Sequence, residues 1–241
     1  MTDGALQPLD EDWQTALVVV AHPDDIEYGA AGAVSKWTSE GKTVVYLLAT
    51  RGEAGIDGMD PSQTREVRTR EEIEGAAVVG VETVEFLDYT DGVVEYGLPL
   101  RHDIARAIRR HRPGVVVTIN MDMRFGQGLA NQADHRAVGL AALDASRDAG
   151  NRWIFPDLLD EGLEPWSGVR MLLVSGSPNP THAVDVGDHV YKGVESLEKH
   201  EAYLEGLGTD VDPEMFLTMN ANAIGIEFGC DYAVSFEVYE V

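Results

Sequence analysis

The sequence predicts an α/β fold: a Rossmann-like, doubly wound, mostly parallel sheet with helices on both faces. First, apolar runs of strand length alternate with longer segments of helical periodicity, which is the order of repeated β-α-β units. Second, runs such as Val115, Val116 and Val117 are apolar at every position, as expected for strands that are covered on both faces. Third, polar segments follow the ends of these runs, where open α/β sheets bind ligands.

The expected elements follow one another without a linker, a repeat or a low-complexity stretch. The patterns predict strand 16–20, helix 30–40, strand 43–49, helix 63–79, strand 84–87, helix 100–110, strand 115–119 and helix 133–149. Gly41 and the pair Pro113-Gly114 are stop signals after the first and third helices. Beyond Gly150 the alternation loosens. There we expect strands at 171–175, 183–186 and 232–239 and a helix over 188–204.

Length and composition favour a single domain over residues 1–241, since 44% hydrophobic content is enough to fill a sizeable core. The single cysteine, Cys230, excludes an internal disulfide framework and a cysteine-rich zinc site. A metal must therefore be held by histidine and carboxylate. No apolar stretch approaches the roughly 20 residues that span a bilayer, and residues 1–12 are too acidic for a signal peptide. We expect a cytoplasmic protein with no membrane span.

The formal net charge of −24 is large, and the only lysines are Lys36, Lys42, Lys192 and Lys199. Such a surface repels nucleic acids and anionic membranes, because both are bound mainly through neutralised phosphates. No nucleic-acid partner is expected. The acidic excess also predicts a halophilic protein, because counterions at high salt screen the self-repulsion that opposes folding. The thermal unfolding midpoint is then expected to rise between low and molar KCl, and an unchanged midpoint contradicts this hypothesis.

One short motif carries most of the chemical information, the His-Pro-Asp-Asp run at 22–25 that follows the apolar segment 17–20. His22 and Asp25 can supply a nitrogen and an oxygen to one divalent ion, while Asp24 between them faces a metal-activated water as a base. The structural alternative is a turn in which one of the two aspartates caps the helix that follows. The motif alone leaves both interpretations open.

Polar segments also follow three other predicted strands, at 50–53, 88–92 and 120–135. The carboxyl ends of parallel strands meet at one edge of the sheet, so these segments should converge on the motif. A catalytic zinc needs three protein ligands and one open position, and His135 is the candidate third ligand. The alternative for His135 is a solvated histidine in the first turn of a helix. Two polar clusters at the same sheet edge weigh against that alternative.

Residues 21–32 (AHPDDIEYGAAG) resemble the signature of the LmbE/PIG-L-like family of zinc-dependent N-acetylglucosaminyl deacetylases. Further blocks follow in family order over most of the chain, at 50–55, 68–81, 91–92, 134–137 and 232–236. The resemblance implies a Rossmann-like fold, with His22, Asp25 and His135 as ligands of Zn²⁺ and Asp24 as the general base. Two histidines and one aspartate also accept other divalent first-row metals.

The reaction that the resemblance implies is hydrolysis of the acetamide of an N-acetylglucosamine-type amino sugar or conjugate by a zinc-activated water. Asp24 takes the proton of that water, and either Asp24 or His182 protonates the leaving amine. His182 can equally be a structural or solvated residue. Gln132 stands where family members often carry a histidine, and it can stabilise an oxyanion but cannot act as an acid. Val234 replaces a common family glutamate, which weakens a role for the last strand in the site.

Substrate contacts are expected from polar residues at strand ends or on the following helix, namely Arg51, Glu53, Arg68 and Asp91. The resemblance favours Arg68, because a family arginine in this helix faces the sugar, although Arg70 is an alternative match to that arginine. Each of the four can instead be a solvated or salt-bridged side chain. The remaining histidines are expected at the surface: His102, His111, His189 and His200.

Two other functions stay open from the sequence. The first is a metal-dependent amidase whose N-acyl substrate is not a sugar, because the same site serves both reactions. The second is a non-catalytic module that binds a metal or a nucleotide. Asp24 argues against that module, since simple metal binding needs no additional carboxylate beside the ion. The expected partner is a small-molecule amino-sugar substrate, and the resemblance also implies a homo-oligomer.

Overall fold

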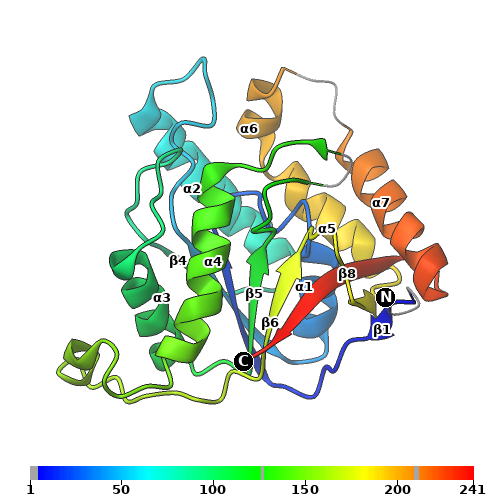
Figure 1. Ribbon diagram of the computed structural model, residues 1–241. Coiled ribbons are helices and arrows are strands. Elements are labelled where there is room, and N and C mark those ends of the chain that lie inside the picture. The colour runs from blue at the N-terminus through cyan, green and yellow to red at the C-terminus, as the bar shows by residue number, and fades with distance from the viewer. Residues whose placement is uncertain (1–4, 126–127, 209–211) are drawn as a thin grey trace.

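The computed structural model describes residues 5–125, 128–208 and 212–241. Over these residues, eight strands form one sheet in the order β1-β7-β8-β6-β5-β2-β3-β4 (Figure 1). The strands are β1 (Gln7–Pro8), β2 (Thr15–Val20), β3 (Thr43–Leu48), β4 (Thr83–Phe86), β5 (Val115–Ile119), β6 (Met171–Ser175), β7 (His182–Asp185) and β8 (Ala233–Glu240). Neighbouring strands run parallel except where β8 pairs with β6 and with β7. The predicted mostly parallel sheet is therefore confirmed.

Helices cover both faces of this sheet, as predicted (Figure 1). They are α1 (Ala31–Ser39), α2 (Pro61–Val78), α3 (Leu98–His111), α4 (Ala133–Asp148), α5 (His189–Glu198), α6 (Glu201–Gly206) and α7 (Pro213–Phe228). Side chains of α1, α2, α5 and α7 share one apolar core with the sheet, and those of α3 and α4 share the other. None of the helices over the described residues has the length and apolar character that a membrane crossing requires.

The central strand β2 shows why its run of apolar residues is continuous. Val18 and Val20 point into the core under α1, whereas Leu17 and Val19 point into the core under α3 and α4. Successive side chains of a strand face opposite sides of the sheet, so a strand covered on both faces needs an apolar residue at each position. β2 pairs in parallel with β3 and β5, which brings the carboxyl ends of the three strands to one edge.

The expected helix over 188–204 is interrupted, and the expectation that His200 lies at the surface is wrong. α5 ends at Glu198, α6 begins at Glu201, and the side chain of His200 turns into the interior with no exposed area. There its Nε2 lies 3.8 Å from a carboxylate oxygen of Glu27 and 3.8 Å from one of Glu72. The other three histidines are half-buried in polar pairs, His102 with Asp157, His111 with Glu85 and His189 with Ser35.

The buried His200 predicts a pH dependence of stability. Burial lowers the pKa of His200, but the carboxylates of Glu27, Glu72 and Asp24 outweigh burial and raise the pKa from 6.5 to about 9. A raised folded-state pKa stabilises the fold fully below pH 6.5, and this contribution is lost as the pH rises through about 9. The free energy of unfolding should fall by up to about 3 kcal/mol across this window. Urea unfolding at several pH values measures the free energy of unfolding. If this energy falls as steeply with pH in His200→Gln as in the wild type, the assignment of the effect to His200 is wrong.

Helix α7 has no counterpart among the predicted elements. Its ends nevertheless carry recognisable signals. Asp212 accepts a hydrogen bond from the backbone N–H of Met215 (3.1 Å), Pro213 occupies the first helical turn, and Gly229 ends the helix with φ +96°. These cap signals, rather than the alternation of strands and helices, could have located it.

Candidate active site

The 22–25 motif forms a turn at the carboxyl end of β2 and does not cap a helix. α1 begins only at Ala31, and no side chain bonds its first turn. Instead, Asp25 Oδ2 accepts hydrogen bonds from the backbone N–H groups of Ala21 (3.0 Å) and His22 (2.9 Å), which precede it. The capping alternative is therefore wrong. The turn folds the carboxylate of Asp25 back toward the end of the strand.

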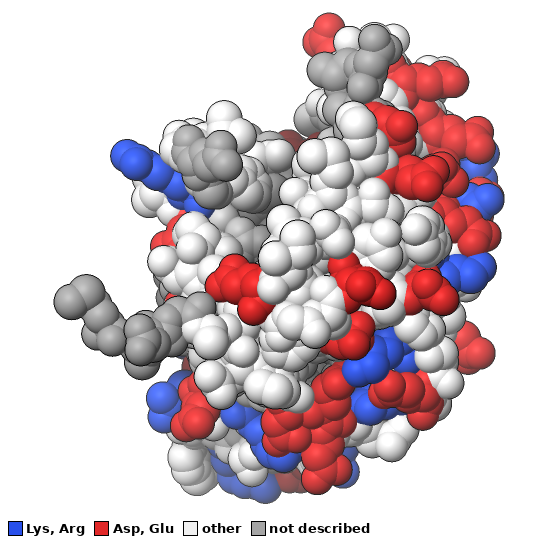
Figure 2. All heavy atoms as spheres, turned by 90° about the vertical axis from the view of Figure 1, so that its right-hand side faces the viewer, with Lys and Arg blue, Asp and Glu red and all other residues white. Residues whose placement is uncertain are grey.

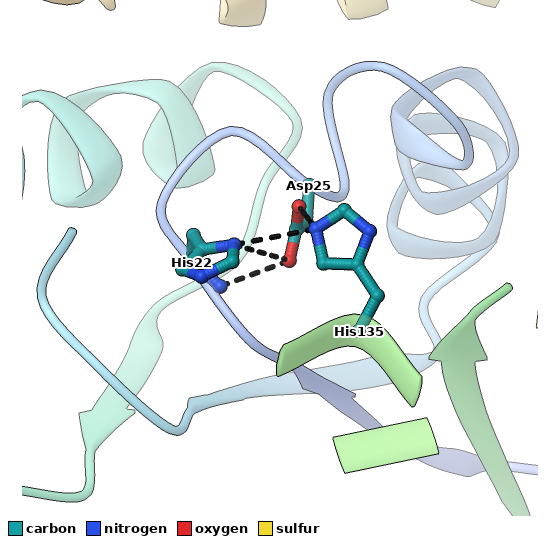
Figure 3. Close-up of side chains that lie close together, drawn as sticks. All are labelled: His22, Asp25 and His135. Carbon is teal, nitrogen blue, oxygen red and sulfur yellow. Dashed lines mark hydrogen bonds and ion pairs between the residues drawn. The ribbon is translucent and has the colours of Figure 1, made fainter. Parts of the chain in front are cut away.

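The side chains of His22, Asp25 and His135 converge on one point above the sheet edge (Figure 3). Asp25 Oδ1 lies 3.0 Å from His135 Nε2, and His135 Nε2 lies 3.3 Å from His22 Nδ1. Asp25 Oδ2 lies 3.7 Å from His22 Nδ1. All three residues are at least nine-tenths buried. The sequence prediction that these residues come together is thus met in the geometry.

The outward-facing nitrogens of the two histidines have partners of their own. His22 Nε2 lies 3.1 Å from Asp91 Oδ1 and 3.3 Å from Asp134 Oδ2, and His135 Nδ1 lies 3.0 Å from Asn131 Oδ1. With protons on these outer nitrogens, His22 Nδ1 and His135 Nε2 offer lone pairs to the shared centre. Such outer partners are characteristic of histidines that hold metals.

Charge in the site favours a cation at this centre. Burial raises the pKa of Asp25, but His135 and His22 outweigh burial and hold the pKa well below its usual value. Burial lowers the pKa of His22, but the carboxylates of Asp25, Asp134 and Asp91 outweigh it and raise the pKa well above the usual value. Two imidazole nitrogens and one ionised carboxylate are the donor set of a borderline divalent metal, so these residues fit such an ion.

A second group that could hold a metal combines His22 with Asp91 and Asp134. Both oxygens of Asp134 already accept backbone N–H groups, from Gly92 (2.8 Å) and from Val94 (3.1 Å). This occupied carboxylate fits an orienting role on the outer side of His22 better than a ligand role. Neither Asp134 nor Asn131 was predicted as a site residue, although Asn131 stands four residues before His135, within reach across the first helical turn.

Asp24 lies beside this centre without belonging to it. Its backbone has φ +88°, in the left-handed region that residues other than glycine seldom adopt. Its Oδ2 lies 3.2 Å from Arg68 Nη2. Burial raises the pKa of Asp24 to about 6, with Arg68 opposing the rise and Asp25 adding to it. A carboxylate with this pKa can exchange a proton near neutral pH.

Arg68, a residue of α2, is buried against the same turn. Its guanidinium donates to the carbonyl oxygens of Pro23 (2.5 Å) and Gly52 (3.1 Å) and lies 4.1 Å from the ring centre of Tyr203. A Cβ atom at Gly55 would lie 2.3 Å from Arg68 Nη1, so glycine leaves the room that the guanidinium occupies. Arg68 is thus fixed next to Asp24.

A cavity of about 790 Å³ opens over these groups. Seven of the predicted residues line it, namely His22, Asp24, Asp25, Arg68, Asp91, Gln132 and His135. Other lining side chains were not predicted, namely Tyr28, Phe125, Tyr203, Phe216 and Asn220. Phe216 and Asn220 come from α7, which was not predicted, and Tyr203 comes from α6, beyond the break in the helix expected over 188–204.

Three predicted residues do not line the cavity. Arg51 lies over the ring of Phe86, with its Cζ 4.4 Å from the ring centre. Glu53 accepts the backbone N–H of Asp91 (3.1 Å) and so positions that loop. His182 begins β7 with its Nδ1 2.9 Å from the hydroxyl of Thr181, and β8 separates β7 from β6. The geometry gives no support to a proton-donor role for His182.

The model of the GlcNAc-PI de-N-acetylase family, PIG-L, matches residues 17–146, more than half of the chain. The chain belongs to the PIG-L family. Its relatives include a diacetylchitobiose deacetylase of Thermococcus kodakarensis, which is 29% identical over 193 residues that cover 79% of this chain and 70% of the relative. A probable N-acetyl-α-D-glucosaminyl L-malate deacetylase of Bacillus anthracis is 30% identical over 54% of this chain and 58% of the relative.

Among solved structures, the N,N′-diacetylchitobiose deacetylase of Pyrococcus horikoshii has the same fold. Its TM-score is 0.85 at 23% identity, and the match covers 95% of this chain and 85% of the other. The relatives named above are deacetylases. The comparisons therefore favour a hydrolase, and they do not favour a non-sugar amidase or a non-catalytic binding module.

Proposed function

We propose that this protein is a zinc-dependent N-deacetylase that removes the acetyl group from an N-acetylglucosamine-type amino sugar or conjugate. The observation that carries the proposal is the buried group His22, Asp25 and His135 with the separate carboxylate of Asp24 beside it. A non-ligating carboxylate next to a metal site is what hydrolysis requires and what simple metal binding does not. The cytoplasmic location stays a prediction.

His22, Asp25 and His135 are the residues that we assign to the metal, and zinc fits their donor atoms, as do other divalent first-row metals. A bound divalent metal supplies Lewis-acid chemistry, which polarises a carbonyl and makes water a stronger nucleophile at neutral pH. Asp91 and Asp134 hold the ring of His22, and Asn131 holds the ring of His135.

Asp24 is the residue that we assign to proton transfer. It takes a proton from the attacking water and returns it to the amine as the C–N bond breaks, so that acetate and a free amine leave. No imidazole stands at position 132, and His182 lies outside the cavity, so Asp24 performs both steps. The Gln132 side chain, exposed at the cavity wall, donates a hydrogen bond to the oxyanion.

We assign substrate binding to residues of the remaining cavity walls. Arg68 presents a charged group for sugar hydroxyls, while Tyr28, Phe125 and Phe216 present aromatic surface for the apolar face of a sugar ring. The two oxygens of Asp91 already meet His22 and the backbone N–H of Ala54, so this residue orients His22 instead. The activities named for the relatives point to the same class of amino-sugar substrate.

Acetate release from a small panel of compounds tests this function. The zinc-loaded protein is expected to release acetate from N-acetylglucosamine or N,N′-diacetylchitobiose at least tenfold faster than from N-acetylmethionine, which lacks the sugar. Equal or faster release from N-acetylmethionine would indicate a non-sugar amidase. No release from any of the three compounds, with one zinc bound per chain, would contradict the proposed function.

We also infer that copies of the chain associate through the outer face of α7. Met215, Met219 and Ile226 are 55%, 65% and 74% exposed on this helix. Figure 2 shows the face that carries α7, with uncharged surface in its middle and acidic side chains around it. Chains with a net charge of −24 repel one another, so an uncharged face is where two copies can approach.

The pair of substitutions Met219→Glu and Ile226→Glu is expected to convert the assembly to monomers, because it places charge in the apolar contact. Light scattering after gel filtration measures the mass. Trp153→Glu is the matched control, since Trp153 is 81% exposed and belongs to the segment that follows α4, on the opposite side of the molecule from α7 (Figure 1). A monomeric wild-type protein, or an unchanged mass in the double variant, contradicts the inference.

A further inference from the structure

A cluster of fully buried ionisable groups lies next to Asp24, among residues that do not line the active-site cavity. Glu27, Glu72 and His200 are at most 1% exposed. His200 Nε2 lies 3.8 Å from an oxygen of each glutamate, and Ser196 donates a hydrogen bond to Glu27 (3.1 Å). Burying three ionisable groups is costly even when they pair, so their presence calls for a role.

One member of this cluster bonds directly to the backbone of Asp24. Glu72 Oε2 accepts the N–H of Asp24 at 3.1 Å. Asp24 has φ +88°, a conformation that persists only when its surroundings impose it. The hydrogen bond to Glu72 is such a constraint, and it acts on the backbone. The ion pair with Arg68 acts on the side chain from another direction.

The position of Glu72 is itself fixed. Glu72 lies on α2, four residues after Arg68, so one face of this helix supplies both groups that hold Asp24. His200 reaches the same carboxylate from the break between α5 and α6. Helix α2 and the break thus close around the turn that carries the candidate base.

We propose that Glu72, held by His200, is a positioning residue that fixes the backbone of Asp24 and thereby aims its carboxylate into the cavity. The proposal rests on the proposed function, in which Asp24 transfers the proton. A displaced base is expected to slow the chemical step, because misplacement by about 1 Å costs on the order of 100-fold in rate. Substrate binding depends on the other walls and is expected to change little.

Two substitutions separate the hydrogen bond from the rest of the side chain. Glu72→Ala removes the acceptor, whereas Glu72→Gln keeps an oxygen that can accept the Asp24 N–H. With zinc-loaded protein and N,N′-diacetylchitobiose, Glu72→Ala is expected to lose about 100-fold in kcat, with KM within about threefold and one zinc per chain. Glu72→Gln should recover most of that loss. Glu71→Gln is the matched control, because Glu71 is buried on the same helix but accepts the N–H of Ala202.

Hydrogen exchange of the Asp24 amide provides a readout that does not need turnover. Exchange should be slow in the wild type and in Glu72→Gln, and about 100-fold faster in Glu72→Ala. An inactive wild type that still shows this pattern contradicts the proposed function but supports the positioning role. Equal exchange in all three proteins, equal kcat in both Glu72 variants, or loss of zinc overturns the positioning role.

The same cluster could instead hold a second metal ion, since its three ligand atoms lie within 4.8 Å of one another. In that case the wild type binds two zinc ions per chain and Glu72→Gln binds one, which overturns the proposal. Should Glu72→Ala fail to fold, His200→Gln decides the question. It is expected to lower kcat about tenfold at unchanged KM, and an unchanged kcat overturns the positioning role.

Discussion

Asp24→Asn is expected to lower kcat for acetate release by about 10³-fold while the protein keeps one zinc per chain. Asparagine has the shape of aspartate but can neither take nor return a proton at neutral pH. It is also the best-matched substitution for this backbone, because asparagine tolerates the left-handed conformation that Asp24 adopts at φ +88°. Acetate release and metal analysis of the same preparation measure both effects.

The control for this substitution is a charge change at a similar depth that leaves the site untouched. Asp148→Asn removes a buried carboxylate that pairs with Arg101 (2.8 Å) between α3 and α4, and it should leave kcat within about twofold while lowering stability. Full activity in Asp24→Asn would show that another group carries the proton. Loss of zinc in Asp24→Asn would instead make Asp24 part of the metal site.

His135→Ala is expected to remove both the metal and the activity. The side chain supplies one of three ligand atoms, and its loss leaves His22 and Asp25 alone to hold the ion. Loss of an orienting partner already weakens a metal site by 10- to 100-fold, so loss of a ligand is expected to weaken zinc binding by more than about 100-fold. Metal analysis after dialysis measures the stoichiometry.

His111→Ala serves as the control for this loss. His111 is a half-buried histidine at the end of α3, paired with Glu85 at 2.9 Å, and its removal should leave the zinc content and kcat unchanged. An unchanged zinc content in His135→Ala would contradict the assignment of His135 as the third ligand. Activity in a zinc-free His135→Ala variant would contradict metal-dependent hydrolysis itself.

The strand ends were the part of the site that the sequence could predict. A continuous apolar run needs a sheet covered on both faces. In a parallel sheet, the polar segments that follow the strands then lie at one edge. His22, Asp25 and His135 could therefore be predicted to lie together, although 110 or more residues separate His135 from the other two. Asp91 lines the same cavity, as the strand ends predict, and so does Arg68, which the family resemblance favoured.

Side-chain direction and strand order could not be predicted in this way. Arg51 and Glu53 follow β3 as predicted, yet one turns to Phe86 and the other to a backbone amide. His182 lies outside the cavity because β8, the strand that follows α7, inserts between β6 and β7. His200 sits in a charged, helix-like segment, and nothing in that local pattern indicates that it turns inward.

The most direct test of the account is the metal dependence of acetate release by the wild-type protein. Protein stripped with a chelator and then dialysed is expected to release no acetate from N,N′-diacetylchitobiose. One equivalent of zinc per chain should restore full activity, and the same addition to His135→Ala should restore none. Full activity of the stripped protein, with less than about 0.1 zinc per chain, would contradict a reaction centred on His22, Asp25 and His135.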